Sequence, residues 1–291
     1  MTQTTAPARL GDEVRRWREL RGLSQLALSS RAEVSTRHLS FIENGRSRPT
    51  AEMILRLASA LEVPMADQND LLLAGGFAPQ HPRRDLADEN LSSVMAGLRG
   101  LLDAHAPYPA LLLDDHWDVV DSNTSVDPLL AGCAPALLEP PINVIRLSLH
   151  PDGLAPRIRN LAQWRAHLIH QLEQRIRITG GDSTLRALHD EVTGYPDATQ
   201  PGVGQPDRGQ STAGSTAAGS TAAGSTAAGS TAAVPVSPVV FLELDSDHGP
   251  LRLFSVASRI EGPADVTLDS LHLETFLPAD AATREKLGSR V

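Results

Sequence analysis

The segment from residue 33 to residue 49, EVSTRHLSFIENGRSRP, combines hydrogen-bond donors with apolar side chains at close spacing. It holds three Arg and one His, several hydroxyl and amide side chains, and an apolar group that includes Leu39 and Ile42. Guanidinium, amide and hydroxyl groups of this kind bind phosphate oxygens and the edges of bases. Whether they do so here depends on which side chains face a core and which face outward.

Charge is unevenly distributed along the 291 residues. The formal net charge is −9, but residues 1–50 hold nine Arg against five Asp or Glu, which gives +4 and leaves −13 for the remainder. We therefore expect a negatively charged partner to bind the N-terminal part of the chain. A hydrophobic content of 41% excludes disorder throughout, and the length allows two domains.

Five short helical patterns fill residues 9–78. Residue types that cap helices stand at their ends: Ser24, Ser35 and Thr50 at N-cap positions, and Gly22, Gly45 and Gly75 after helix ends. So many short, capped helices in so few residues predict a compact all-α domain.

Two of these helices, within LSQLALSSRAEVSTRHLSFIENGRSRPT, are expected to pack together across a tight turn. The positions expected to be buried are Leu28, Ala32, Val34, Leu39 and Ile42. The second helix then presents a mixture of donors and apolar surface that suits base edges in a major groove. The candidate DNA-contacting residues, on this helix, at helix ends and in the following loop, are Gln25, Ser35, Thr36, Arg37, Ser40, Phe41, Asn44, Arg46 and Arg48.

This stretch resembles the helix-turn-helix of the Xre family of lambda-repressor-like regulators. The family's Gln at the start of the second helix and its ENG plus a basic residue after the third are present as Gln25 and as ENGR at residues 43–46. The resemblance covers residues 10–76 and implies a lambda-repressor-like fold with double-stranded DNA as the partner. Glu33 departs from the pattern, because the family usually has Gly there; we expect either a left-handed backbone, at about 1 kcal/mol, or a different turn. The alternative interpretation is a plain Arg-rich helical bundle.

Residues 88–285 show a different pattern, which predicts an α/β domain. A helix is expected over residues 90–104, then a hairpin that turns at residues 114–116, then helices over residues 157–178 and 182–192. Three strand patterns follow after residue 238. Because two strands do not form a stable sheet alone, we expect the three to complete the sheet begun before the helices.

Residues 198–237 interrupt this domain. They contain no aromatic residue and include four copies of GSTAA from Gly214 to Ala233. A five-residue period matches neither a strand nor a solenoid repeat, and small polar side chains do not repay the entropy of ordering. The segment is predicted to be a flexible, disordered linker.

Three stretches after residue 90 resemble the C-terminal half of MmyB-like Xre regulators: PYPALLLDDHWDVVDSN, LHPDGLAPRIRNLAQWRAHL and LHLETFLPADAATRE. The resemblance implies a PAS-like α/β domain, which in this family can hold a fatty acid. Candidate lining residues for a small apolar ligand are Leu111, Trp117, Val119, Trp164, Leu168, Phe241, Leu253 and Phe254. Core packing without a ligand explains each of them equally well. A domain that serves only as a protein-interaction platform is the alternative function.

Other candidate sites rest on weaker patterns. A metal could bind one helical face through His167, His170 and Glu173. Haem could be ligated by His105, His116 or His272. Cys133 could act as a thiol sensor. A polar helix face and a small buried Cys are the simpler interpretations. The sequence has no Gly-rich phosphate loop, nucleophile elbow or paired-carboxylate signature, so we expect no enzyme activity, no metal and no cofactor.

A cytoplasmic homodimer is expected. The longest apolar runs are too short to cross a bilayer. One recognition helix reads only a few base pairs, so two DNA-binding domains must pair. Two parts of the chain could pair them: the helix over residues 90–104, or the sheet domain after it. The apolar face of that helix consists of Leu91, Val94, Leu98, Leu101 and Leu102. Lys286 is the only Lys beside 25 Arg, which favours a GC-rich, actinobacterial genome.

Overall fold

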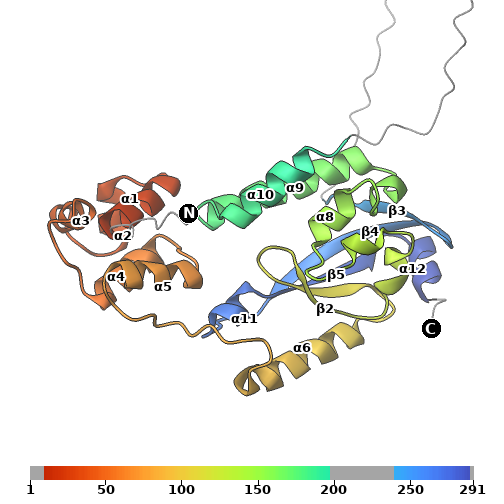
Figure 1. Ribbon diagram of the computed structural model, residues 1–291, viewed down its shortest axis with the longest axis horizontal. Coiled ribbons are helices and arrows are strands. Elements are labelled where there is room, and N and C mark those ends of the chain that lie inside the picture. The colour runs from red at the N-terminus through yellow and green to blue at the C-terminus, as the bar shows by residue number, and fades with distance from the viewer. Residues whose placement is uncertain (1–9, 197–238, 289–291) are drawn as a thin grey trace, which may run out of the picture.

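The computed structural model describes residues 10–196 and 239–288, and it contains a helical unit followed by an α/β unit (Figure 1). The helical unit consists of α1 (Leu10–Leu20), α2 (Gln25–Arg31), α3 (Thr36–Glu43), α4 (Ala51–Ala60) and α5 (Met65–Ala74). The predicted all-α fold is therefore confirmed. The predicted linker at residues 198–237 lies outside the described residues.

Side-chain caps fix where the helices of the helical unit begin. The hydroxyl groups of Ser24, Ser35 and Thr50 accept the backbone N–H of Ala27, His38 and Met53. Each bond satisfies one of the N–H groups that a helix leaves free in its first turn. The predicted N-caps are confirmed, and the fully buried side chains of Trp17, Leu28 and Leu39 share one core between the helices.

The turn between α2 and α3 has a left-handed residue that is not Gly. Glu33 has a φ angle of 55°. Its neighbour Val34 donates its N–H to the carbonyl of Ser29 at 2.9 Å. The first of the two expectations for Glu33 is thus the correct one: the turn stays tight, and the chain accepts a backbone cost of about 1 kcal/mol.

One five-stranded antiparallel sheet forms the centre of the α/β unit. Its strands are β1 (Ala110–Leu113), β2 (Val119–Ser122), β3 (Leu242–Ser246), β4 (Gly249–Arg259) and β5 (His272–Pro278), in the order β2-β1-β5-β4-β3. Leu112 of β1 pairs with Leu273 of β5, which joins the early hairpin to the three late strands. The expectation that the late strands complete the first sheet is confirmed.

Helices cover both faces of this sheet (Figure 1). They are α6 (Ser92–Ala104), α7 (Asp127–Leu130), α8 (Val144–Leu149), α9 (Leu161–Ile178), α10 (Ser183–Thr193), α11 (Val266–Ser270) and α12 (Ala281–Gly288), with 3-10 turns at Glu89–Leu91, Pro135–Leu137 and Ala155–Arg157. The sequence predicts α6, α9 and α10. It does not predict α7, α8 and α11, because helices of four to six residues are too short to show a 3.6-residue period.

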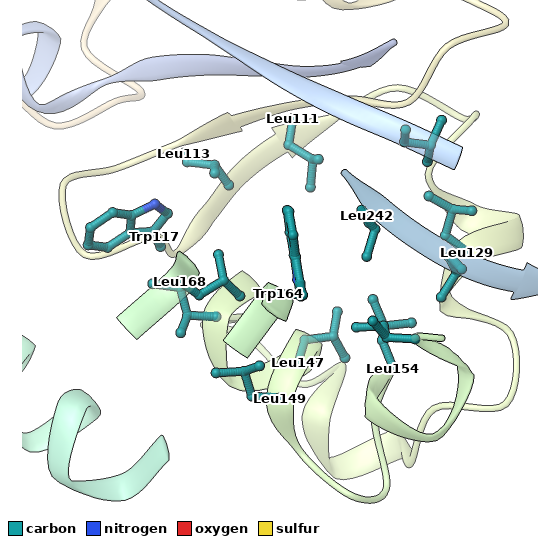
Figure 2. Packing of buried hydrophobic residues seen from close by; sticks show 14 of the residues in the cluster. Leu111, Leu113, Trp117, Leu129, Leu147, Leu149, Leu154, Trp164, Leu168 and Leu242 are labelled. Carbon is teal, nitrogen blue, oxygen red and sulfur yellow. The ribbon is translucent and has the colours of Figure 1, made fainter. Parts of the chain in front are cut away.

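Alternation along the strands separates two cores. On one face Ala110, Leu112 and Leu273 pack against Leu102 of α6. On the other face a larger core lies between the sheet and α8, α9 and α10. Figure 2 shows Trp164 of α9 within this core, between Leu111 and Leu242 of the sheet and Leu147 of α8.

Candidate DNA-binding face and ligand groove

Helix α3 presents a polar surface on the side away from the core. Thr36 and Arg37 are exposed and Ser40 and Phe41 are half-buried, while Leu39 and Ile42 are buried. The guanidinium carbon of Arg37 lies 5.3 Å from the centroid of the Phe41 ring. The remaining candidates at the ends of α3 and in the loop, namely Ser35, Asn44, Arg46 and Arg48, are also exposed. Eight of the nine candidate residues therefore lie on α3, at its ends or in the loop that follows it.

The ninth candidate, Gln25, belongs to a network around the buried carboxylate of Glu43. Glu43 is 2% exposed, and it accepts two bonds from Arg18, at 2.7 Å from Nε and 3.0 Å from Nη2. Nε2 of Gln25 donates to the same carboxylate at 2.8 Å. Nη2 of Arg15 donates to the Glu43 carbonyl at 2.9 Å and to Oδ1 of Asn44 at 3.0 Å. These bonds fix α3 against α1 and α2.

Burial and hydrogen bonding act on Glu43 in opposite directions. Burial raises the pKa of its carboxyl group, but the bonds from Arg18 and Gln25 outweigh burial and hold the pKa below its ordinary value. The buried charge is therefore paired at neutral pH, and no negative charge from Glu43 faces the outer surface of α3. Sequence reasoning had Glu43 only as part of the ENGR motif and missed its buried pair with Arg18, because an acidic residue on a short helix is normally interpreted as a solvated side chain.

A groove of about 510 Å³ lies between α9 and the sheet. Helix α9 covers the groove, and the C-terminal end of β4 and the N-terminal end of β5 form its floor. The lining residues are Trp117, His170, Gln171, Gln174, Arg175, Ile178, Ser255, Ala257, Arg259, His272 and Glu274. Strand alternation places Ser255, Ala257 and Arg259 on the same face as the buried Leu253. The groove thus continues the larger core toward solvent, with polar side chains in place of Leu.

Only Trp117 of the eight predicted pocket residues lines this groove. Leu111, Trp164, Leu168 and Leu253 pack with Trp117 in the larger core, and Val119 packs against it. The other two predicted residues, Phe241 and Phe254, lie apart from the groove. The Phe241 ring lies 3.9 Å from the guanidinium carbon of Arg252. Phe254 follows Leu253 on β4, so its side chain faces the opposite side of the sheet. The sequence does contain a signal for the groove floor: the alternation of Leu251 and Leu253 along β4 continues to Ser255, Ala257 and Arg259 on the same face of the strand.

Two arginines and one aspartate form an ion cluster at one end of the groove. Asp115 accepts from Nη1 of Arg175 at 2.5 Å and from Nη2 of Arg259 at 2.9 Å. Arg175 also lies over the ring of Trp117, 5.4 Å from its centroid. Trp117 has a φ angle of 63°, so the turn after β1 directs this side chain in a way that the strand pattern alone does not predict. The cluster is held by its own members before any ligand binds.

The helical unit contacts the C-terminal end of α9. Arg21, directly after α1, donates to the carbonyls of Arg177 and Ile178, each at 3.0 Å, and Arg16 of α1 donates to the carbonyl of Gly180 at 2.7 Å. Cationic side chains stabilise a helix C-terminus, where carbonyl groups lack partners. Because Ile178 also lines the groove, α9 joins the groove directly to α1.

A second cavity, of about 440 Å³, lies between the two units and contains several carboxylates. Contact with Asp114, and then the charge of Asp182, raise the pKa of His116 to about 9 against the effect of burial. Nε2 of His116 lies 3.5 Å from Oδ1 of Asp182. Burial, with Asp70 nearby, raises the pKa of Asp67 to about 6. The proton on His116 is therefore retained at neutral pH, and Asp67 loses its proton at a higher pH than an ordinary Asp.

The metal and thiol candidates lie in ordinary structural surroundings. Within residues 10–196 and 239–288, no three His, Cys, Asp or Glu side chains are grouped so that they could hold a metal ion. Gln171 bonds His167 at 2.9 Å and Gln174 bonds His170 at 3.1 Å. Cys133 is buried, and burial raises the pKa of its thiol. Among the helices of the described ranges, none has the length and apolarity needed to cross a membrane.

Comparisons with known proteins assign both parts of the chain to families. Residues 94–289 match the model of the MmyB-like transcription regulator ligand binding domain, and residues 14–68 match a helix-turn-helix model. A solved structure, "Structure of an RNA-binding Light-Oxygen-Voltage Receptor", aligns at 13% sequence identity with a TM-score of 0.25. That alignment covers 97% of this chain and 64% of that one. The comparison with curated proteins found no match.

Proposed function

The chain belongs to the MmyB-like transcription regulators, and from this we propose that it is a DNA-binding homodimer whose affinity for its operator responds to a small ligand in the C-terminal domain. We take residues 9–78 as the DNA-binding domain and residues 88–285 as a PAS-like ligand-binding domain. The observation that carries the proposal is the exposed polar surface of α3, which the network around Glu43 holds in place. No catalytic role is proposed for any residue.

The exposed residues of α3 and of the following loop take different parts in this proposal. Arg37, on the helix, reads a base edge in the major groove, since a guanidinium pairs with two acceptors of guanine. Arg46 and Arg48 lie after the helix and bind phosphates, which sets the position of the helix without reading sequence. Gln25 holds the recognition helix through Glu43, and Asn44, exposed at the end of this helix, bonds Arg15.

The ligand binds in the groove under α9 in this proposal, because the eight side chains expected to line a pocket mostly fill a packed core. The family resemblance implies a fatty acid. Trp117, Ala257 and Ile178 give such a chain an apolar path along the groove. A ligand changes DNA affinity only by its difference in affinity for two arrangements of the protein. The bonds from Arg16 and Arg21 to the end of α9 are the contact through which those arrangements differ.

Helix α6 supplies the dimer contact in this proposal. Leu101 is 44% exposed on this helix, although it belongs to the apolar face expected from the sequence. A C-terminal domain that only binds another protein would use the same exposed Leu101, and it would not respond to a ligand.

Genomic footprinting followed by titration of the purified chain against the footprinted site tests the function. We expect protection of an imperfect palindrome and sequence-specific binding that weakens as salt rises. A chain that binds random duplex DNA as tightly as the footprinted site would contradict the proposed function.

A further inference from the structure

Asp115 is bonded to both arginines of the groove, and it also faces the cavity between the two units. We propose that the carboxylate of the ligand takes the place of Asp115 on these arginines, and that the released Asp115 weakens the contact between the α/β unit and the helical unit. This inference rests on the proposed function, since it describes how binding in the same groove is regulated and passed on.

The two arginines form a site that suits one carboxylate. Arg175 comes from α9 and Arg259 from the end of β4, and both line the groove. The side chain of Arg175 is only 17% exposed, and its bond to Asp115 is the one hydrogen bond that it makes with the described residues. A guanidinium has five N–H donors in a fork that matches a carboxylate, so most donors of Arg175 are unused. Asp115 holds this site while no ligand is bound.

The rest of the lining directs a ligand carboxylate to this site. Burial, together with the charges of the two arginines, lowers the pKa of His272 to about 4, so its ring is neutral at pH 7. Burial raises the pKa of Glu274, so this carboxyl group is protonated more readily than an ordinary Glu and opposes an anion less. Trp117 and the half-exposed Ile178 provide apolar contacts for the alkyl chain.

Asp115 itself lines the other cavity, the one between the two units. This cavity is rich in carboxylates from both sides: Asp67 and Asp70 from α5, and Asp114, Asp182 and Asp269 from the α/β unit. The cationic side chains of its lining, His116 and Arg83, already act on other carboxylates, namely Asp114 and Asp182 for His116 and Asp70 for Arg83. An Asp115 that has lost its arginines therefore adds an unbalanced negative charge between the units.

Asp269 is the residue on which this charge acts most directly. Its carboxyl group accepts the backbone N–H of Met65, the first residue of α5. Because α5 begins after Pro64 and has no side-chain cap of its own, this bond from the α/β unit satisfies one of its free N–H groups. Burial, and then the charge of Asp115, raise the pKa of Asp269. Release of Asp115 from its arginines strengthens this repulsion at a contact with the DNA-binding unit.

Asp115→Asn in the full chain tests the exchange with decanoate at pH 7.5, below its critical micelle concentration. Calorimetry measures decanoate binding, and fluorescence anisotropy measures operator affinity with and without decanoate. We expect the variant to bind decanoate about tenfold more tightly than wild type, because the ligand displaces no carboxylate. We also expect decanoate to change its operator affinity less, because an amide releases no charge into the cavity. Loss of a purely structural residue would not raise ligand affinity while it lowers the response.

Two controls accompany this variant. Asp121→Asn removes another carboxylate of the same hairpin, one that Arg99 bonds at 2.7 Å outside the lining of both cavities, and it leaves both quantities unchanged. The second control is a ligand, 1-decanol, which has the same alkyl chain without the charge. Since it does not displace Asp115, we expect it to leave the operator affinity of wild type unchanged.

The outcomes separate this inference from the proposed function. If decanoate binds Asp115→Asn no more tightly than wild type, or changes the operator affinity of both equally, the exchange is wrong and ligand sensing stands. An equal response of wild type to 1-decanol and decanoate also overturns the exchange, and this comparison needs no variant to fold. If decanoate does not bind wild type, the ligand-sensing part of the function is wrong together with the inference, while operator binding is judged by its own titration.

Discussion

Arg21, directly after α1, donates from Nη2 to the backbone carbonyl of Ile178 at 3.0 Å, and the side chain of Ile178 lines the groove between α9 and the sheet. One residue of α9 thus touches the DNA-binding unit with its backbone and the proposed ligand with its side chain. A shift of α9 on ligand binding alters the place where α1 is held, which gives a physical route from groove to operator.

Arg16→Ala tests this route, because Arg16 bonds the Gly180 carbonyl beyond α9 and otherwise pairs only with Glu13 and the Trp17 ring among the described residues. We expect a loss of about 1 kcal/mol in the free energy of unfolding. We also expect a smaller effect of the fatty acid decanoate on operator affinity, measured by fluorescence anisotropy with and without this probe.

Arg56→Ala serves as the control for this substitution. Arg56 pairs with Glu52 on the same helix and costs about 0.5 kcal/mol or less when removed. The route through α9 is wrong if Arg16→Ala and Arg56→Ala respond equally to the probe.

Arg37→Ala is expected to relax sequence discrimination at one base pair by about 1 to 3 kcal/mol, because it removes a guanidinium from the recognition surface. Operators substituted at single positions, titrated against wild type and variant, measure this loss. If the variant discriminates as sharply as wild type, Arg37 does not read a base.

Arg46→Ala is the comparison for Arg37→Ala. Because this substitution removes a cation that binds phosphate, we expect it to lower affinity for all sequences alike and to make the slope of log affinity against log salt shallower by about 1 per subunit. Unequal losses across the substituted operators would show that Arg46 also reads sequence.

Glu43→Gln is expected to destabilise the DNA-binding unit by about 3 kcal/mol, because it leaves the buried Arg18 guanidinium without its charged partner. The pKa of Glu43 is depressed in the folded chain, so its contribution is present above the ordinary pKa of a Glu and is lost as the pH falls through the folded value. Urea unfolding at several pH values should show this acid-side loss in wild type and not in Glu43→Gln. A variant as stable as wild type would show that the pair contributes nothing.

His116 should make stability fall between about pH 7 and pH 9.5. Its pKa is raised to about 9, so its stabilising contribution is complete below the ordinary His pKa and disappears as the pH rises through 9. We expect a loss on the order of 1 kcal/mol, since the pair with Asp182 is about one third exposed and partly screened. The melting temperature of His116→Gln should change less with pH over this range than the melting temperature of wild type. Asp67 changes charge near pH 6 and does not interfere above pH 7. Parallel pH profiles for both proteins would contradict this role.

Local signals predicted much of the fold. The hydroxyl caps at Ser24, Ser35 and Thr50 and the periodicity of α1 to α5 depend on neighbours in sequence, so they could be read directly. The joining of β1 to β5 followed from the need for more than two strands.

The interior of the site depends on contacts that leave no local pattern. Arg16 and Arg21 bond backbone carbonyls more than 150 residues away, and a carbonyl has no residue type to recognise. The groove face of α9 carries His170, Gln171 and Gln174, which read as an ordinary solvated surface until β4 and β5 are placed below them. Trp117 depends on a positive φ angle in a turn, which its side chain does not favour.

The central claim is that a ligand-responsive dimer reads a two-fold operator. Sedimentation velocity of the full chain with the footprinted duplex, with and without the fatty acid decanoate, tests it most directly. We predict two chains per duplex, half-sites about one DNA turn apart or a multiple of that spacing, and a change in the bound fraction when decanoate is added. One chain on a single asymmetric site, with a bound fraction that decanoate does not change, would contradict the account.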